Sequence, residues 1–596
     1  MILQSLVQYY EALERKGKAA RPGWCNAKVS FALELSREGQ LKRVISLKEE
    51  RERGKKMIWE PQIMMVPEMV TRSSGISSNF LCDNSSYFLG VDNKGKPERS
   101  LECFRCAGEK HKEIMDGLDS AAAKAILQYF ATWKPETAGE NPVLADTLEE
   151  ILAGANLVFW IEDDFAQDVA EIRDAWEQHC TASVNAANGI CLVTGQRTEI
   201  ARIHGNIKGM KDAKPRGAVL VSFNEPSFES YGKKQSFNSP VGKYAVYAYT
   251  TALNALVADK KHSTTIGDMT ILYWSEDGEE ACQDIFFHMS EPSRDNYEIV
   301  NDVFKNLEAG KAVHVDGVEK NISLEQKFFI VGLSPNAARI AVRFFYQDSF
   351  GNILKHLKEH YDRMDIVRPF NDTMQYLGVW RMLMETVNKK SKDKKPIPNM
   401  AGAVYRAIIS GGRYPDALYQ SVISRIRAEQ DDSDSGSYKI TRGRAAIIKA
   451  FLLRNRDYDK EGITVAVNDE STNVAYTLGR VFAVLEEIQE IANPGINATI
   501  KDRYFNAACA TPASIFPILF KLKNSHTRKF SGKGAEIFYE TKLTDLQGKI
   551  AGPDNDGTGS YPKRLSLEEQ GMFILGYYHQ TQKRYEKKTK EEQENE

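Results

Sequence analysis

Two histidines four residues apart have the spacing that most directly suggests chemistry, in the segment HLKEH at residues 356–360. Histidines at this spacing share one face of a helix, and the order HxxEH is that of inverted zincins, in which the pair holds zinc with a distant carboxylate. A pattern this short is a weak signal in a chain of 596 residues, and Lys358 and Asp362 fit a solvated amphipathic helix equally well. A zinc-dependent hydrolase or nuclease that uses His356 and His360 is therefore the alternative function.

A second pair of possible metal ligands is Cys103 and Cys106, with His111 nearby. A structural zinc site usually needs two such cysteine pairs, and Cys82 is the one isolated cysteine in reach along the chain. The pair lies within a helical pattern, where cysteines at i and i+3 are often packing residues. We predict no metal ion and no cofactor for this protein.

Two further segments resemble binding motifs. The segment GVDNKGKP nearly matches a phosphate-binding loop, but Pro97 occupies the position of the Ser or Thr that would hold magnesium, so we interpret it as a turn that ends a strand. The acidic run Glu162-Asp163-Asp164 follows a buried strand, where acids commonly begin the next helix. Neither segment supports hydrolysis, and no Ser-His-Asp spacing does so elsewhere, so we expect no enzymatic activity.

Hydrophobic periodicity predicts the elements that would position these residues. The segments KVSFALEL and LKRVISL around SREGQ predict a hairpin, and IMMVP, SSYFLGVD, ANLVFWIE, MTILYWSED and FFIVGLS predict strands. Short strands between glycine turns are predicted for GICLVTG, TEIARIHGNI and GAVLVSF. Helices are predicted for the opening segment, for residues 99–131 and for VGKYAVYAYTTALNALVAD. The segment PNAARIAVRFFYQ fits either a helix or a strand.

Beyond about residue 350 the strand patterns almost vanish. The run TNVAYTLGRVFAVLEEIQEIA predicts a helix that ends at Asn493, and a capping box of Ser566 and Glu569 begins a last helix. The predicted fold class is α+β, a mixed N-terminal body with antiparallel sheet elements followed by a C-terminal helical bundle. We place its boundaries at residues 1–350, 351–464 and 465–596.

The charge balance limits the classes of function. Lys and Arg number 79 against 81 Asp and Glu, a formal net charge of −2, which excludes a protein that binds nucleic acid over its whole surface but allows local basic patches. No stretch approaches the roughly 18 apolar residues of a membrane span, and the opening helix carries acids that a signal peptide lacks. Eight scattered cysteines form no disulfide framework. We expect a cytoplasmic protein with no membrane partner.

Three long segments carry a specific resemblance: Val221–Val257, Phe328–Ile353 and Gly479–Leu522. Together with MILQSLVQYYEAL and RSSGISSNFLCDNSSYFLG, they resemble the large subunit of the subtype I-C CRISPR surveillance complex, Cascade. The resemblance runs over the whole chain in family order. It departs at Cys103 and Cys106, because the family's helix there carries no such pair.

The resemblance implies a non-catalytic subunit of a ribonucleoprotein that recognises the protospacer-adjacent motif in double-stranded target DNA and supports R-loop formation. Its implied partners are the crRNA, the backbone and handle-binding subunits of Cascade, and the separate helicase–nuclease. It also implies that the same gene yields a small subunit by internal translation. Val465 or Val467 is then the candidate start, since no methionine lies between Met400 and Met572.

Short polar loops are the candidate DNA contacts, because a reader of a short motif needs small polar groups near base edges and cations near phosphates. For each loop, an ordinary turn rich in Ser, Asn and Gly is the alternative. Ser334 and Pro335 are interpreted as a helix start whose first turns could bind phosphate. The candidates are Arg72, Ser73, Ser74, Asn79, Lys208, Lys211, Lys233, Lys234, Gln235, Asn238, Asn336 and Arg339.

Basic residues of the C-terminal bundle are candidates for tracking the phosphates of the displaced strand, with Tyr504 or Phe505 as a stacking platform. The alternative is that the aromatic residues are core and the bases are solvated. The candidate cations are Lys501, Arg503, Lys521, Lys523, Arg528 and Lys529.

Overall fold

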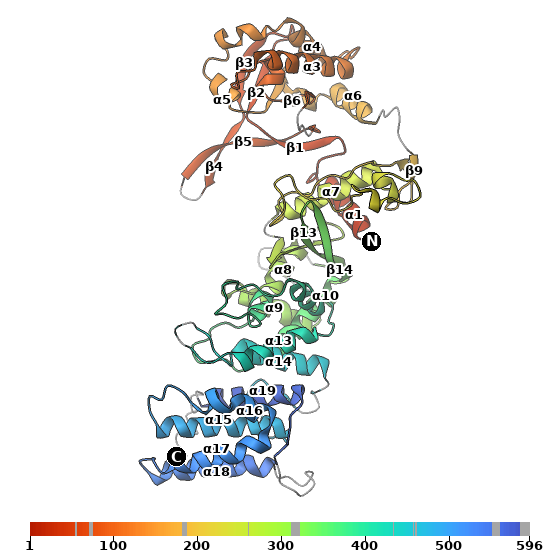
Figure 1. Cartoon of the computed structure of the whole chain (residues 1–596). Coiled ribbons are helices and arrows are strands. Elements are labelled where there is room, and N and C mark those ends of the chain that lie inside the picture. Colours follow the sequence, from red (N-terminus) through yellow and green to blue (C-terminus); the bar gives the residue numbers. More distant parts are fainter. Residues whose placement is uncertain are drawn as a thin grey trace. The chain divides into compact units, whose positions relative to one another are not determined.

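The computed structural model describes residues 1–53, 56–70, 75–181, 188–259, 262–311, 322–432, 434, 436–456, 458, 462–550 and 561–584. Contacts between residues divide the chain into two compact units, residues 3–205 with 223–252, and residues 206–222 with 253–596. The fold class is α+β as predicted, with mostly antiparallel sheets in the N-terminal half, where only β2 and β7 pair in parallel among the described strands, and helices in the C-terminal region (Figure 1).

The first unit holds two main sheets. A three-stranded sheet has the order β1-β5-β4, and a five-stranded sheet has the order β3-β2-β7-β6 with β8 paired to β7. The largely buried strand β2 and a turn at Gly39, with φ of 75°, form the predicted hairpin of β2 and β3. The strands are β1 Trp24–Val29, β2 Phe31–Leu35, β3 Leu41–Ser46, β4 Lys48–Arg53, β5 Lys56–Pro67, β6 Cys82–Asp83, β7 Leu157–Ile161, β8 Asp164–Phe165, β9 Asn188–Ile190 and β10 Arg197–Glu199.

Helices supply the rest of the core of the first unit. Phe88, Phe159 and Tyr129 are among its largest fully buried side chains, and Phe88 stacks on Phe159 with ring centroids 4.6 Å apart. The helices are α1 Ile2–Arg15, α2 Ser85–Phe88, α3 Pro97–Met115, α4 Ala121–Thr132, α5 Leu148–Leu152, α6 Ala170–Thr181 and the first part of α7 Lys243–Ala258.

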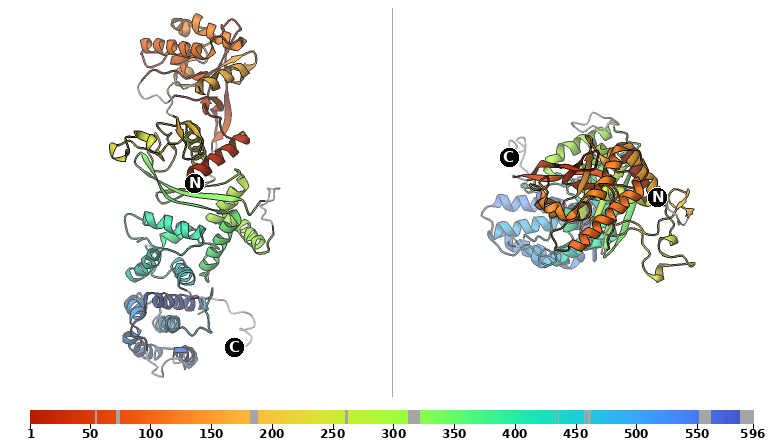
Figure 2. Two further views of the ribbon diagram at one scale, coloured as in Figure 1. Left: turned by 90° about the vertical axis from the view of Figure 1, so that its right-hand side faces the viewer. Right: turned by 90° about the horizontal axis from the view of Figure 1, so that it is seen from above.

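The second unit begins with one antiparallel sheet of order β11-β12-β13-β14. Its long hairpin of β13 and β14 is the pair of green strands that run side by side in Figure 2. The strands are β11 Ser263–Ile266, β12 Met269–Ser275, β13 Lys327–Asn336 and β14 Arg339–Ser349. After Ser349, the described residues contain no further strand, only one isolated bridge of Asp432 with Ser437.

Helices make up the remainder of the second unit, and one continuous apolar core runs from Ile266 to Tyr578. Helices α15 and α19 cross closely, with glycines at the contact. A Cβ at Gly479 would overlap the carbonyl oxygen of Phe573, and one at Gly576 would overlap that of Tyr476. The helices are α8 Glu280–Ser290, α9 Tyr297–Glu308, α10 Phe350–Met364, α11 Val379–Met384, α12 Pro398–Ile409, α13 Asp416–Ala428, α14 Arg442–Asn455, α15 Val474–Ala492, α16 Ile500–Ala510, α17 Pro512–Thr527, α18 Lys533–Ile550 and α19 Leu567–Lys583.

Several predicted elements are wrong, each for a local reason. The segment SSYFLGVD forms the short helix α2, because the side chain of Asn84 caps it by accepting from the Ser86 amide. Glu162 and Asp163 adopt positive φ in the turn between β7 and β8 and do not begin a helix. The segment GAVLVSF contributes only isolated bridges, at Ala218 and Val219.

Candidate nucleic-acid interface

The structure brings two of the predicted DNA-contact segments together in the second unit. The Val219 amide donates to the carbonyl of Ala338 at 2.9 Å, and the Ile340 amide donates to the carbonyl of Val219 at 3.0 Å. A bridge of Ile207 with Ala218 closes the loop that precedes Val219. The loop that carries Lys208 and Lys211 therefore lies beside the tip of the β13–β14 hairpin.

At this tip the predicted helix start is wrong. Ser334 and Pro335 belong to β13, and Ala337 turns the chain with φ of 54° into β14. The chain forms a strand here because β-branched and aromatic residues of β13 and β14 pair in a long antiparallel ladder. Asn336 is exposed and Arg339 is partly buried, so both remain at the surface without the helix N-terminus proposed as their phosphate site.

Two asparagines that are not among the predicted site residues hold the loop in place. The Asn254 side chain on α7 accepts from the Lys208 amide at 2.8 Å and donates to the carbonyl of Asn206 at 3.2 Å. The Asn206 side chain donates to the carbonyl of Arg216 at 3.1 Å. The one available signal was a polar residue within the apolar run TALNALVA. These bonds fix the backbone that carries the loop's cations.

The loop's cations are exposed and uncompensated. Lys208, Lys211, Lys214 and Arg216 are all exposed, and none of them makes an ion pair with a carboxylate among the residues that the structure describes. Within the described part of the chain, Lys211 donates to the carbonyl of Gly267, at 3.3 Å. A loop of this kind attracts phosphates, because its positive charges have no carboxylate partner to compete. Lys214 and Arg216 extend the predicted set.

The loop of Lys233 and Lys234 belongs to the first unit, and its asparagine has a structural role. The Asn238 side chain accepts from the Ser230 amide at 2.8 Å and donates to the carbonyls of Lys233 and Gln235 at 2.8 and 2.9 Å. These contacts use both amide hydrogens and one oxygen lone pair, so Asn238 positions the loop and has little left to read a base.

The same loop presents an aromatic ring at its tip. Tyr231 has φ of 53° and its side chain is fully exposed. The neighbouring Lys233 and Lys234 are exposed as well. Gln235 is partly buried, and its backbone amide donates to the Glu229 carboxylate at 3.0 Å. An exposed ring beside two cations suits stacking on an unpaired base better than reading of a base edge.

Asn79 lies in the interior of the first unit. Asn79 is 2 % exposed, and its side-chain oxygen accepts a hydrogen bond from the Val70 backbone amide at 2.8 Å. A base contact by Asn79 would require this segment to open, so the structure favours a structural role for it. Three other candidates of the same loop, Arg72, Ser73 and Ser74, lie outside the described residues.

The C-terminal cations divide into two groups. Lys501 lies 2.6 Å from the Asp431 carboxylate and Lys523 pairs with Glu540, and both ammonium groups are largely enclosed. Burial lowers the pKa of Lys501, but the carboxylates of Glu486 and Asp431 outweigh it and raise that pKa overall. These two lysines stabilise the bundle. The exposed cations are Arg503, Lys521, Arg528 and Lys529.

The two proposed stacking residues also differ in burial. Phe505 is 1 % exposed and packs between Phe482 and Phe573, so it is core, as the alternative interpretation had it. Tyr504 is partly buried. A stacking platform at this position would have to rely on Tyr504 alone.

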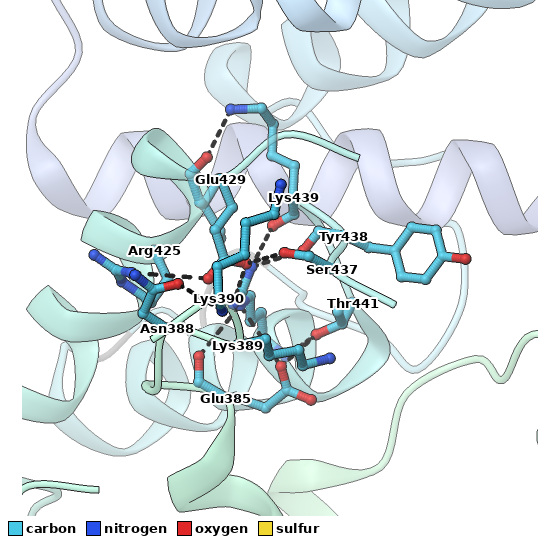
Figure 3. A network of polar contacts seen from close by, with 12 residues as sticks. Glu385, Asn388, Lys389, Lys390, Arg425, Glu429, Ser437, Tyr438, Lys439 and Thr441 are labelled. Atoms are coloured by element: carbon cyan, nitrogen blue, oxygen red, sulfur yellow. Dashed lines mark hydrogen bonds and ion pairs between the residues drawn. The ribbon is translucent and has the colours of Figure 1, made fainter. Parts of the chain in front are cut away.

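A buried polar network in the same unit uses cations for contacts inside the fold (Figure 3). The Arg444 side chain is fully buried, its Nη2 lies 2.7 Å from a Glu429 carboxylate oxygen, and its Nη1 donates to the carbonyls of Tyr438 and Lys439. Thr441 adds a bond to Glu385 at 2.8 Å. The network clamps the acidic segment after α13 onto α14.

The histidine pair on α10 has structural partners. Nδ1 of His356 lies 2.9 Å from the carbonyl oxygen of Ile409, and Nδ1 of His360 lies 2.7 Å from the hydroxyl of Tyr414. Burial, with help from Arg363, lowers the pKa of His360 to about 3. Among the described residues, no group of three or more His, Cys, Asp or Glu is placed to hold a metal ion. The zinc alternative therefore has no third ligand in that part of the chain.

The cysteine pair on α3 is likewise part of the packing. Cys103 is buried, and His111 uses both ring nitrogens, with Nε2 accepting from the Leu81 amide at 3.1 Å and Nδ1 bonded to the carbonyl of Ala107 at 2.7 Å. Burial lowers the pKa of His111 to about 4, which keeps it neutral. Pro97 opens α3 and ends the loop that resembled a phosphate-binding motif.

Comparisons with known proteins identify the family. No helix in the described part of the chain is both long and apolar enough to cross a membrane. A search of curated proteins gave no match. The family model described as CRISPR-associated protein (Cas_Csd1) matches residues 6–585, and because this match covers nearly the whole chain, the protein belongs to that family.

Proposed function

We propose that the protein is the non-catalytic large subunit of a subtype I-C Cascade, which recognises the adjacent motif in duplex DNA and supports R-loop formation. Membership of a CRISPR-associated family supports a role in such a complex. The observation that carries the proposal is the basic surface formed by residues 206–216 and the β13–β14 tip, because two segments predicted separately meet there.

This surface has the two kinds of group that duplex recognition needs. Lys208, Lys211, Lys214 and Arg216 supply uncompensated charge for phosphates, which positions a duplex without reading it. The exposed amide of Asn336 lies at the hairpin tip beside them, and an asparagine can bond both donor and acceptor on an adenine edge. Asn336 is therefore our candidate reader.

The assembled complex tests this assignment. The Asn336→Ala variant should lose discrimination between correct and wrong adjacent motifs, by about 1–3 kcal/mol, with little change in binding to non-target DNA. The Lys208→Ala/Lys211→Ala variant should weaken binding to every duplex. The Lys305→Ala variant, which removes an exposed cation of α9, is the control. Equal discrimination by Asn336→Ala and the parent complex would contradict the role of Asn336.

The proposal includes partners that the resemblance implies. The large subunit would lie near the crRNA 5′ handle and the handle-binding subunit, and would help recruit the helicase–nuclease. Internal translation from Val465 or Val467 would yield a small subunit, and both residues precede α15, so its five helices α15–α19 would remain whole. Mass spectrometry of the complex purified from the intact gene should find a second species of about 130 residues. Its absence, together with normal assembly after silent recoding of both codons, would exclude internal initiation.

The proposal also states that the chain has no nuclease activity of its own. The purified protein should cut no DNA with magnesium or zinc, and metal analysis should find no stoichiometric zinc. Cleavage that co-purifies with the protein and vanishes in the His356→Ala/His360→Ala variant would favour the zinc-dependent alternative.

A further inference from the structure

A groove of about 500 Å³ lies between β14 and α12 in the second unit. Three arginines line it, Arg343, Arg406 and Arg413, and its described lining contains no carboxylate. None of the three is among the candidate DNA contacts predicted from the sequence, and none belongs to the proposed duplex surface. A concave site lined by three arginines, of which Arg343 pairs with the Asp268 carboxylate outside the lining, keeps two uncompensated cations and so favours an anionic ligand.

Arg343 is aimed by an irregularity of the sheet. Gly332 pairs with Phe344 and Leu333 pairs with Val342, so Arg343 is the extra residue of a β-bulge. Bulges re-aim side chains, and here the guanidinium is held by Ser334 Oγ at 3.1 Å, Asn399 Oδ1 at 3.4 Å and Asp268 Oδ2 at 3.3 Å. Its position is therefore fixed before any ligand arrives, which lowers the entropy cost of binding.

Arg406 and Arg413 supply the uncompensated charge. Both are exposed, and neither makes an ion pair in the part of the chain that the structure describes. On α12, Asn399, Gly402 and Arg406 follow at helical spacing and share one face. Gly402 opens the floor of the groove, since a Cβ there would already contact the side chains of Met269 and Arg343.

The histidine pair of α10 supports the turn that carries Arg413. His356 bonds the carbonyl of Ile409 and His360 lies against the Tyr414 hydroxyl, so the turn is held on both sides of Arg413. Gly411 in this turn has φ of 60°, and a Cβ there would collide with the His356 ring. The HLKEH segment, which resembled a metal site, thus positions the rim of the groove.

We propose that this groove binds the sugar–phosphate backbone of a single nucleic-acid strand. The proposal rests on the proposed function only in taking nucleic acid as the anion. Two exposed guanidinium groups without ion pairs among the described residues line the same groove as the bonded guanidinium of Arg343, and three such groups can bind successive phosphates of one strand. The volume suits one strand and is too small for a duplex, and the lack of an exposed ring in the lining predicts binding without sequence preference.

Fluorescence anisotropy of the full-length protein tests the proposal, with labelled oligothymidine and a labelled duplex at several salt concentrations. The Arg406→Ala/Arg413→Ala variant should bind oligothymidine at least tenfold more weakly, and its salt slope should fall by about 1.4. Its affinity for the duplex should stay within twofold of the parent. The Ala403→Glu variant, which puts a carboxylate on the exposed face of α12, should reproduce the loss, and Lys305→Ala should not.

Different results would contradict the groove proposal and the proposed function. Binding of oligothymidine within twofold of the parent in the double-arginine variant, or no binding by the parent, overturns the groove proposal. Competition by millimolar inorganic phosphate as strong as that by unlabelled oligothymidine also overturns it, because the groove would then be a small-anion site. Groove-dependent strand binding in a complex with no adjacent-motif dependence would sustain the groove and contradict the proposed function.

Discussion

Two regions of the second unit use lysine and arginine in opposite ways. In residues 206–216 the cations are exposed on a loop held by asparagines, and they have no carboxylate partner within the described chain. In helices α14–α19, Arg444, Lys501 and Lys523 are enclosed and bonded to carboxylates. The same residue types are thus exposed and unpaired in one region and form the internal frame of the other. The difference follows from burial, because the paired cations lie between the packed helices, whereas the exposed cations of the bundle, such as Arg503 and Lys521, resemble those of the loop.

The internal frame predicts the largest loss of stability. Arg444→Met should lower the free energy of unfolding of the second unit by about 3–5 kcal/mol, because it leaves the buried Glu429 carboxylate without its main cation. Urea unfolding measures this change. The Arg444→Met/Glu429→Gln variant should recover much of the loss. A change below about 0.5 kcal/mol, the usual size for a surface substitution, would remove the contrast between the two regions.

The loop predicts a loss of binding without a loss of stability. Substituting Lys208, Lys211 and Lys214 by alanine should lower the slope of log affinity against log salt by about 2.7 for duplex DNA, because each phosphate contact contributes about 0.9. Stability should change by less than about 0.5 kcal/mol. Salt titrations with duplex DNA measure the slope, and Lys305→Ala serves as the control. An unchanged slope would mean that these cations contact no phosphate.

A buried carboxyl outside both regions, Glu291 at the end of α8, gives the second unit a pH dependence. Burial raises the pKa of Glu291 to about 7, although the Trp380 and Val379 amides bond it and act in the opposite direction. Between about pH 4.5 and 7 the Glu291 carboxyl is therefore protonated in the folded state and ionised in the unfolded state. The free energy of unfolding falls as pH rises through this window. The free energy of unfolding of the Glu291→Gln variant should exceed that of the parent by about 3 kcal/mol at pH 8 and match it near pH 4.

Denaturation at a series of pH values measures this difference. Gln retains an oxygen that can accept from the two amides at the start of α11, so the capping contact is kept. A constant difference between variant and parent over the whole pH range would show that Glu291 does not titrate in this window.

The smallest expected effect concerns the loop of the first unit. Asn238→Ala removes three bonds to the backbone of residues 230–235, so amide hydrogen exchange there should accelerate, by an amount equivalent to about 1 kcal/mol. Lys233→Ala/Lys234→Ala should leave exchange unchanged and weaken DNA binding. Unchanged exchange in Asn238→Ala would mean that its side chain remains available to read a base, as the sequence had suggested.

Regular elements were predictable where a long apolar pattern fixed them. The hairpin of β2 and β3, the strands β7, β12 and β13, and the helices α7 and α15 all follow their periodicity. The segment around Pro335 was misinterpreted because Ser-Pro is a good local helix start, yet pairing along β13 and β14 outweighs that preference. Local signals of this kind fail where tertiary pairing decides the conformation.

The candidate site was only partly predictable, because burial and pairing are not visible in residue type. Asn79 resembles any polar loop residue, and only the fold encloses it. Lys501 meets Asp431 across about 70 positions of the chain, too far for any local pattern to find. Arg343 and Arg406 face the same groove because of a β-bulge, which leaves no mark in the sequence. Lys208 and Lys211 were predictable because the polar composition of their loop indicates a surface position, whereas Lys214 and Arg216 lie just beyond the predicted loop.

The close crossing of α15 and α19 constrains where the gene can be divided. Each of these helices supplies one glycine at the contact, Gly479 and Gly576, and neither position tolerates a side chain. A shorter product that starts at Val465 or Val467 carries both halves of the contact, whereas one that starts after codon 479 would carry α19 without its counterpart. A product that keeps this contact must therefore start before Gly479 and end after Gly576.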